Sequence, residues 1–401
     1  MNEDNSLPLS GIRVLEMGQL IAGPFAGQML AAFGAEVVKI EPPGRGDPLR
    51  TWRVLDEQGT SYWWRSLARN KKSLTLDLSQ EQGADIARQL MMQADILIEN
   101  FRPGRMEAWG LGPDAMKKLH PELIYTRVSG YGQSGPYARK PGFASACEAA
   151  GGLRYVNGYP DEKAVRMNLS LGDTLAGMHA TVGALLALIA RQRLGQGGQT
   201  VDVSIVESVF NMLEGVLPEY DGAGVVREPS GSTVTGIVPT NTYQCSDGRY
   251  IVIGGNGDSI FKRLMVAIGQ AELAEDARLA DNRGRVANEA EIDALLSAWS
   301  ATVSSVEALE ILDAADVPAG PVNSIADMVQ DPHFQARDMF ESLAVNGESR
   351  LMPAVHPRLE RTPASSRWAG PELGQHTDEV LRSWLRAGNE DIARWREKRL
   401  L

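Results

Sequence analysis

The chain is poor in cysteine and has no excess of positive charge. Its 401 residues include only two cysteines, Cys147 and Cys245. So few cysteines argue against a secreted protein held together by disulfides and against a zinc site built from several thiolates. The 51 acidic residues outnumber the 40 lysines and arginines. The resulting net charge of -11 disfavours nucleic acid as a partner, because an acidic surface repels phosphate backbones.

Long apolar runs and targeting signals are also missing. The longest apolar stretch, 180–190, has about eleven residues, whereas a bilayer span needs ~20. Residues 1–11 (MNEDNSLPLSG) are polar and acidic and lack the basic and apolar regions of a secretory signal. Otherwise the composition, with 43% hydrophobic and 23% charged residues, is ordinary for a globular protein. We therefore expect a soluble, cytoplasmic protein with no membrane partner.

The usual motifs of cofactor enzymes and hydrolases do not occur where they are expected. The first predicted turn reads MGQLIAGPFAG, which lacks the dinucleotide fingerprint G-x-G-x-x-G, and there is no phosphate-binding P-loop. No G-x-S-x-G nucleophile elbow is present. The five histidines do not show the H-E-x-x-H spacing of a zinc hydrolase. We expect no metal, nicotinamide or flavin.

What the first half does contain is an alternation of short apolar runs with helical patterns. The expected strands are 12–17, 36–41, 73–78, 95–101, 123–132 and 199–207. Alternation of this kind predicts an α/β fold, in which a mostly parallel sheet has helices on both faces.

The second half of the chain shows a different sequence pattern. Its expected features are a long apolar helix at 174–193, a loop or linker at 218–240, a hairpin around Ser-Asp-Gly at 246–248, helices within 260–316, a returning linker at 317–335 and a C-terminal helix at 377–397. The hairpin and the helices after it predict a smaller α+β domain. The expected division is 1–217 for the first part of the large domain, 218–328 for the small domain with its linkers, and 329–401 for the return to the large domain.

Basic and aromatic residues are interleaved between Arg45 and Lys72 (GRGDPLRTWRV, then YWWRSLARNKKS). Such a segment offers ion pairs and ring stacking to a phosphorylated ligand that carries adenine. A solvated loop whose tryptophans pack on the domain explains the same pattern equally well. Both interpretations stay open on the residues alone.

Asp173 stands in SLGDTLAG, where the long apolar helix is expected to begin. Aspartate is among the best N-cap residues, so a structural cap is one interpretation. The same position stabilises an ionised carboxylate, because the helix N-terminus carries partial positive charge. An ionised carboxylate in a sheltered site is also a nucleophile. The two interpretations are compatible.

Seven segments together resemble one known family, the class III CoA-transferases, also called the carnitine-dehydratase/bile-acid-inducible or formyl-CoA transferase family. They occur in the family's order and span nearly the whole chain. The segments are GIRVLEMGQLIAGPFAGQMLAAFGAEVVKIEPPGRGD, RNKKSLTLDL, DILIENFRPG, GYGQSGPYARKPGF, LGDTLAGMHATVGALLAL, VPAGPVNSIADMVQDPHF and LGQHTDEVL.

This resemblance implies a fold and an activity. Family members have a Rossmann-like large domain formed by both chain ends, a smaller domain inserted between them, and two subunits interlocked as a homodimer. They move CoA from an acyl-CoA donor to a free carboxylic acid, with CoA as part of the substrate. The family's catalytic aspartate maps onto Asp173, which forms an acyl-aspartyl anhydride and then an aspartyl-CoA thioester.

The resemblance also implies binding residues. Those expected near CoA are Arg45, Arg50, Lys71, Lys72, Asn100, Phe101 and Phe143. Ile21 takes the place of a glutamine found in formyl-CoA transferases, which argues against formyl-CoA or oxalate as substrates. The run YWWRSLARNKKS is similar to that of the family's succinyl-CoA:dicarboxylate branch. Candidate acceptors are then itaconate, citramalate, malate or 3-hydroxy-3-methylglutarate, and the candidate cations for the distal carboxylate are Arg53, Arg65 and Arg69.

Two other functions stay open. A 2-methylacyl-CoA racemase shares the fold but needs a histidine as proton carrier where this chain has Phe143, which carries no proton. A CoA-binding accessory protein without transferase chemistry is the other alternative, and a substitution of Asp173 would separate it from an enzyme.

Overall fold

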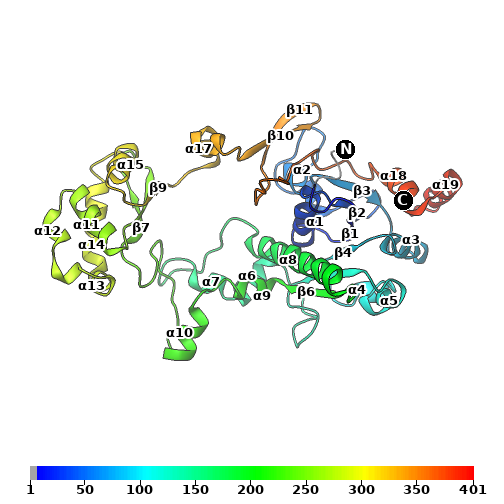
Figure 1. The fold of residues 1–401 in the computed structure, drawn as a ribbon, viewed down its shortest axis with the longest axis horizontal. Coiled ribbons are helices and arrows are strands. Elements are labelled where there is room, and N and C mark those ends of the chain that lie inside the picture. Colours follow the sequence, from blue (N-terminus) through cyan, green and yellow to red (C-terminus); the bar gives the residue numbers. More distant parts are fainter. Residues whose placement is uncertain (1–6) are drawn as a thin grey trace. The chain divides into compact units, whose positions relative to one another are not determined.

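The protein is described by a computed structural model that covers residues 7–401 and divides into two compact units (Figure 1). Unit 1 consists of the chain up to Leu153, Met167–Glu214 and Ala336–Leu401, and unit 2 consists of Arg154–Arg166 and Gly215–Gln335. These limits differ from the expected division mainly because Arg154–Arg166 groups with unit 2. Part of the segment 1–11, on which the missing secretory signal was argued, lies outside the described residues.

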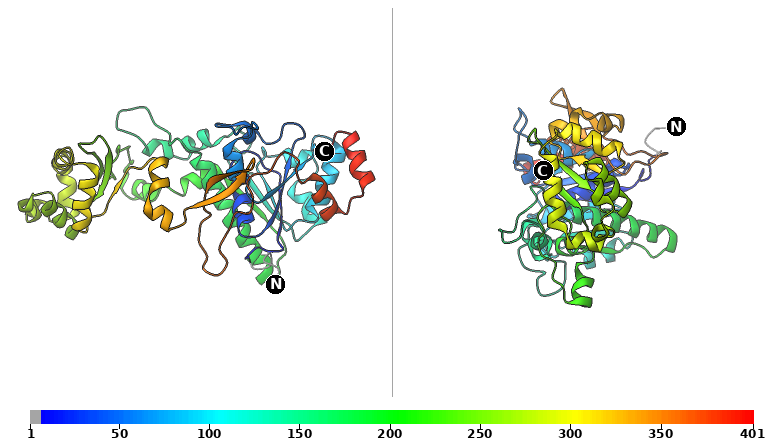
Figure 2. Two further views of the ribbon diagram at one scale, coloured as in Figure 1. Left: turned by 90° about the horizontal axis from the view of Figure 1, so that it is seen from above. Right: turned by 90° about the vertical axis from the view of Figure 1, so that its left-hand side faces the viewer.

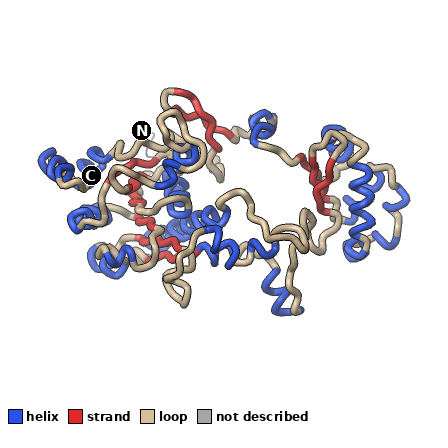
Figure 3. Tube along the Cα trace, turned by 180° about the vertical axis from the view of Figure 1, so that it is seen from behind, coloured by secondary structure: helices blue, strands red, loops and turns tan. Residues whose placement is uncertain are grey.

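Unit 1 is built on a six-stranded parallel sheet, drawn in red in Figure 3. Its strands are β1 (Arg13–Glu16), β2 (Glu36–Glu41), β3 (Lys71–Thr75), β4 (Ile96–Glu99), β5 (Ile124–Ser129) and β6 (Thr200–Ser204). They lie in the order β3-β2-β1-β4-β5-β6, with every neighbouring pair parallel. The predicted parallel α/β sheet and all six strands are confirmed, although the third begins earlier and ends earlier than expected.

The two faces of the sheet bury separate apolar cores, because successive residues of a strand point to opposite faces. One face packs Val14, Val37, Ile96, Ile98 and Ile124 against α1 (Ala22–Ala32) and α8 (Leu171–Leu194). The other packs Leu15, Val38, Ile40, Leu97 and Tyr125 against α3 (Glu81–Met91), α18 (Thr377–Leu385) and α19 (Asn389–Glu397). In Figure 2 the red C-terminal helices accordingly lie beside the cyan part of the chain.

The remaining elements of unit 1 are short. They are η2 (Pro48–Thr51), α2 (Tyr62–Leu67), α4 (Arg105–Ala108), α5 (Pro113–Leu119), α6 (Ala144–Ala150), α9 (Ile205–Phe210), β10 (Phe340–Val345) and β11 (Glu348–Pro353). Helix α7 (Leu153–Val156) starts at the last residue of this part of unit 1 and otherwise belongs to unit 2. The prediction of one C-terminal helix was wrong. Arg386 adopts a left-handed backbone (φ 56°) that ends α18, and α19 starts after Gly388.

Unit 2 combines a three-stranded antiparallel sheet with helices. The sheet contains β7 (Thr240–Gln244), β8 (Tyr250–Gly254) and β9 (Ala319–Pro321), and the predicted hairpin is confirmed as β7 and β8. The other elements are α10 (Val216–Ala223), α11 (Asp258–Ala267), α12 (Ala271–Ala274), η3 (Ala277–Leu279), α13 (Asn282–Ala287), α14 (Glu289–Ser300), α15 (Ser305–Ala314), α16 (Ile325–Gln330) and α17 (Pro332–Ala336). Helix α10 therefore occupies the start of the segment that was expected to be a loop.

Helix α8 packs closely along α1. A Cβ atom at Gly177 would lie 2.7 Å from the carbonyl oxygen of Ala22, so only glycine permits this approach. By length and composition α8 is able to cross a membrane, and so is the bent pair α14 and α15. The helix is longer than the apolar stretch considered in the sequence, but its contacts with α1, β5 and β6 are those of a core helix.

A cluster of four buried charges lies under the loop that follows β1. Glu16 accepts from Lys39 (2.8 Å) and pairs with Lys71 (2.7 Å), and Lys39 also pairs with Asp47 (2.9 Å). Lys39 donates to the carbonyl of Gly18 as well. Although burial raises the pKa of Glu16, the two lysines lower it by more, so the carboxylate stays ionised. The cluster thereby ties three strands to the loop after β1.

Replacing Glu16 by glutamine tests the cluster. Glu16→Gln leaves the two lysines without their shared counter-charge, and we expect a loss of about 3–5 kcal/mol in the free energy of unfolding. Equilibrium urea unfolding measures it. The matched control is Glu291→Gln, which breaks an exposed pair with Arg278 (3.2 Å) and is expected to cost less than about 0.5 kcal/mol. Equal losses in both variants would contradict the assigned role.

Candidate active site

The carboxyl ends of β1 and β4 form the point where the sheet's strand order reverses direction. In open α/β sheets, ligands bind in the crevice outside the strands at such a point. Asn100, directly after β4, is hydrogen-bonded to the loop after β1. Its side-chain oxygen accepts from the Gln19 N–H (2.7 Å), and its side-chain amide donates to the Gln19 carbonyl (2.8 Å). Leu20 follows with a left-handed backbone (φ 64°), and its N–H donates to Asp47 of the charge cluster. These hydrogen bonds fix the loop after β1 at the carboxyl edge of the sheet.

Asp173 lies at the same edge of the sheet. Helix α8 leads into the parallel strand β6 and therefore runs opposite to the strands, which puts its first turn at their carboxyl ends. The helix begins at Leu171 with Ser170 as N-cap. The expected cap role of Asp173 was wrong, because this residue is already the third of the helix. Its half-buried carboxylate instead belongs to the first turn, where the helix N-terminus stabilises an anion.

A buried thiol lies close to Asp173. Burial, together with the charge of Asp173, raises the pKa of Cys147 to about 11. Tyr131, after β5, hydrogen-bonds the thiol. A thiol with such a pKa is neutral near pH 7 and is a poor nucleophile. Asp173 therefore has no ionised cysteine beside it to compete for an acyl group.

Four of the residues expected near CoA lie in positions that a ligand at this edge can reach. Asn100 and Phe101 follow β4, and the Phe101 ring meets Trp109 edge-on with centroids 5.1 Å apart. Arg45 is exposed after β2. Phe143, just before α6, is 72% exposed. For these residues CoA binding stays a prediction.

The other three residues expected near CoA form ion pairs with carboxylates of the protein itself. Arg50 is buried, chelates Glu41 (2.7 and 2.8 Å) and lies 3.8 Å over the Trp64 ring. Lys71 belongs to the buried charge cluster. Lys72 bridges Glu36 and Glu379 and lines a cavity of about 750 Å³ at the opposite, amino edge of the sheet. These internal ion pairs favour structural roles for the three side chains, and their contact with CoA stays a prediction.

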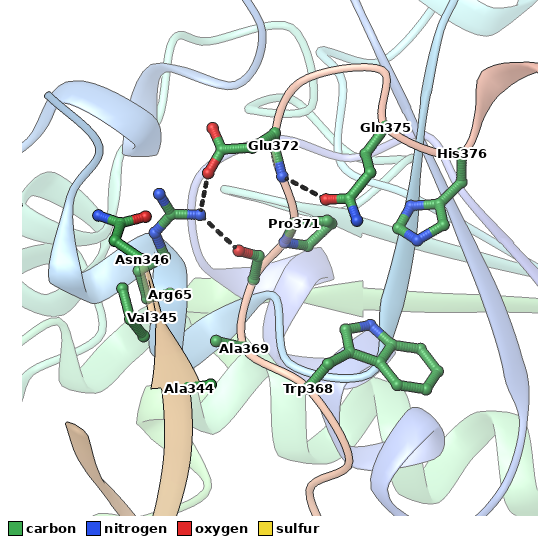
Figure 4. A pocket seen from close by; sticks show the side chains of 11 residues that line it. Arg65, Ala344, Val345, Asn346, Trp368, Ala369, Pro371, Glu372, Gln375 and His376 are labelled. Atoms are coloured by element: carbon green, nitrogen blue, oxygen red, sulfur yellow. Dashed lines mark hydrogen bonds and ion pairs between the residues drawn. The ribbon is translucent and has the colours of Figure 1, made fainter. Parts of the chain in front are cut away.

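Two of the expected substrate cations are likewise engaged. Arg65 pairs with Asp56 (2.9 Å) and Glu372 (2.5 Å) beside a cavity of about 390 Å³, and it donates to the Gly370 carbonyl (Figure 4). Arg69 donates to the Pro353 carbonyl at 2.7 Å and is also buried. Both side chains anchor the returning C-terminal segment, which the sequence alone did not indicate.

Arg53 differs from these two cations. It is exposed, adopts a left-handed backbone (φ 61°), and its guanidinium lies 4.1 Å from the centroid of the Trp63 ring. Ile21, the residue in the place of glutamine, is buried with Leu49 and Trp64. Of the residues expected to contact the acid substrate, only Arg53 presents an exposed charge.

Sequence reasoning missed a second group of cations at the carboxyl edge. We call Arg102, Arg105, Arg139 and Lys140 the basic cluster. All four are exposed, and Arg102 donates to the Arg139 carbonyl (3.2 Å), which joins the segments after β4 and β5. Lys140 lies 3.5 Å from the centroid of the Tyr137 ring. The sequence contains a signal for this cluster, because DILIENFRPG and GYGQSGPYARKPGF are both among the segments that resemble the family and together carry Arg102, Arg139 and Lys140. Such cations suit the phosphates of an anionic ligand.

No group of three or more histidine, cysteine, aspartate or glutamate side chains in residues 7–401 is arranged to hold a metal ion. The side chains described above place a half-buried carboxylate at a helix start and exposed cations at the carboxyl edge of the sheet.

Comparison with known proteins identifies the family. The model of CoA-transferase family III matches residues 9–377. A succinyl-CoA–D-citramalate CoA-transferase from Chloroflexus aurantiacus is 45% identical over 398 residues, which cover 98% of this chain and 98% of that protein. The beta subunit of a succinyl-CoA–L-malate CoA-transferase from the same organism is 39% identical over 400 residues, covering 99% and 98%.

The fold agrees with that assignment. The crystal structure of a CAIB/BAIF family protein from Brucella suis superposes with a TM-score of 0.84 at 32% identity, over 95% of this chain and 100% of that one. The chain belongs to CoA-transferase family III and is a CoA-transferase enzyme.

Proposed function

We propose that this enzyme transfers CoA from succinyl-CoA to a dicarboxylic acid, with Asp173 as the nucleophile. The observation that carries the proposal is the half-buried carboxylate in the first turn of α8, at the carboxyl edge of the sheet. The names of the two Chloroflexus relatives support succinyl-CoA as donor and a dicarboxylate of the citramalate or malate type as acceptor.

The proposed reaction keeps the acyl group activated throughout. The Asp173 carboxylate attacks the thioester carbonyl of succinyl-CoA and expels the CoA thiolate, which leaves a mixed anhydride. The thiolate attacks the aspartyl carbonyl, releases succinate and forms an aspartyl-CoA thioester. The acceptor carboxylate attacks that thioester and expels the thiolate, which then attacks the acceptor's carbonyl in the second anhydride. The products are the acceptor's CoA thioester and free Asp173, and no ATP is needed.

Two requirements of this chemistry match the surroundings of Asp173. Water hydrolyses each intermediate, so the carboxylate must be sheltered, as its partial burial provides. A competing nucleophile would divert the acyl group, and the raised pKa of Cys147 keeps that thiol protonated.

The distal carboxylate of a dicarboxylate needs a cation, and we assign this role to Arg53. It is the exposed member of the three candidate arginines, and Trp63 holds its guanidinium plane. A non-glycine residue holds a left-handed backbone at a cost, and such strain concentrates at functional sites.

We also propose that the enzyme works as an interlocked homodimer. Met178, Val182, Leu186 and Ile189 are exposed along α8 at spacings of four, four and three residues, which places them on one face of the helix. An apolar stripe of this kind is typical of an interface. A second copy of the chain is the occupant that the family resemblance suggests.

Replacing Asp173 tests the covalent mechanism. We expect Asp173→Ala to lower CoA exchange by about 10³-fold or more, because the nucleophile is removed. In the wild type, hydroxylamine added with succinyl-CoA should leave a hydroxamate on Asp173, detected by peptide mass spectrometry. The matched control is Asp114→Asn, an aspartate in the first turn of α5, which should keep full activity. Unmodified Asp173 in an active enzyme would rule out the mechanism.

Arg53→Ala tests the dicarboxylate assignment. Loss of one charge-assisted hydrogen bond, worth about 1.5–3 kcal/mol, should raise the KM for a dicarboxylate acceptor at least about tenfold. The KM for a monocarboxylate of equal length should stay within about twofold, since it has no second charge. Initial rates with a panel of acids and succinyl-CoA measure both. A wild-type enzyme that accepts only monocarboxylates would refute the assignment.

The basic cluster is tested by CoA affinity. We expect Arg105→Ala combined with Lys140→Ala to raise the Kd for CoA by about tenfold or more, because two phosphate contacts are lost. Isothermal titration calorimetry with CoA and with dephospho-CoA shows which phosphate is involved. Arg278→Ala, which removes one exposed arginine of unit 2, serves as the surface control. Unchanged affinity in the double variant would remove the cluster from the CoA site.

A further inference from the structure

The first turn of α8 takes its cap from another helix. Its N-cap residue, Ser170, makes no side-chain hydrogen bond to the helix. Instead, the N–H of Gly172 donates to the Oε1 atom of Glu148, at 3.0 Å and 24 residues away in sequence. Glu148 belongs to α6, which packs against α8. The N–H that is capped precedes Asp173 by one residue.

Glu148 is buried and lies in close contact with Gly172. Glu148 is only 2% exposed. A Cβ atom at Gly172 would lie 3.0 Å from the Cγ atom of Glu148 and 3.1 Å from the Cγ2 atom of Ile205. Alanine at position 172 would therefore require the Glu148 or Ile205 side chain to shift by a few tenths of an ångström. Glycine at this place lets the carboxylate and the backbone approach to hydrogen-bond distance.

We propose that Glu148 is a positioning residue for the nucleophile. Helix ends fray when their first N–H groups have no acceptor, and a carboxylate is the strongest acceptor that a side chain offers. By holding the Gly172 N–H, Glu148 fixes the backbone from which the Asp173 side chain projects. A reacting group displaced by about 1 Å loses on the order of 10² in rate. This inference rests on the proposed role of Asp173.

Two substitutions at position 148 separate the effect of the hydrogen bond to Gly172 from the effect of the negative charge. Glutamine at position 148 has nearly the same shape, keeps an acceptor oxygen and loses the negative charge. Aspartate keeps the charge but is one methylene shorter, which withdraws the carboxylate from the Gly172 N–H. If position matters, Glu148→Gln should be active, whereas Glu148→Asp and Glu148→Ala should be slow.

The test measures single-turnover formation of the aspartyl-CoA thioester on Asp173 by quenched-flow mass spectrometry, together with kcat and KM. We expect Glu148→Ala and Glu148→Asp to slow adduct formation and kcat by about 10–100-fold, with the KM for succinyl-CoA within about threefold. We expect Glu148→Gln to stay within about fivefold of the wild type. The control is Ser304→Ala, which removes the N-cap of α15 in unit 2 and should weaken the fold without slowing the adduct.

The outcomes are distinct. Adduct formation at the wild-type rate in Glu148→Ala or, where that variant does not fold, in Glu148→Asp overturns the positioning role. A Glu148→Gln enzyme as slow as Glu148→Asp also overturns it, because an acceptor held in nearly the same position would then not preserve the rate. Failure of the wild type to form any adduct refutes the proposed nucleophile itself, which is a different result from an unchanged rate in the variants.

Discussion

The buried pairing of Glu16 with Lys39 and Lys71 is the interaction on which the site depends most. Bringing such charges out of water is expensive, and only close opposite charges and further hydrogen bonds compensate for it. Lys71 shows the cost directly: burial lowers its pKa to about 8 in spite of Glu16. What the cluster provides is position, since Lys39 holds the Gly18 carbonyl and Lys71 holds the Pro24 carbonyl at 2.6 Å. The strained loop between β1 and α1 is thereby fixed.

The position of Asp173 follows from that loop through direct contacts. Lys71 fixes the first turn of α1 at Pro24, and Gly177 brings α8 against Ala22 of the same turn. Asp173 stands one helical turn before Gly177, so a shift of α1 would move the proposed nucleophile with it. On its other side α8 is held by α6 through Glu148. The carboxylate is therefore located by two independent supports, one from the sheet and one from a neighbouring helix.

The sequence predicted the sheet better than the surroundings of the cations. The run EVVKIE is apolar between turn signals, and β2 has the expected limits, 36–41. Asp173 is proposed as the nucleophile because its segment carries the family's pattern. The internal ion pairs of Arg50, Arg65 and Lys71 were not predicted, because charge and spacing do not show whether a cation meets a ligand or a buried carboxylate. Their partners, Glu41, Asp56 and Glu16, lie at other points of the chain, and only the folded arrangement brings them together.

Placing a carboxylate at a helix start has two opposing effects on its reactivity as a nucleophile. Stabilising the anion lowers its tendency to attack, yet an exposed or fraying position would leave it hydrated and misplaced. The helix dipole contributes about 0.3–1 kcal/mol for an exposed anion and up to about 2 kcal/mol for a partly buried one, which is at most about a thirtyfold effect on rate. Precise placement is worth more, on the order of 10² in rate per ångström. The weak electrostatic cost and the large positional gain together explain why a helix N-terminus braced by two neighbours suits a nucleophilic aspartate.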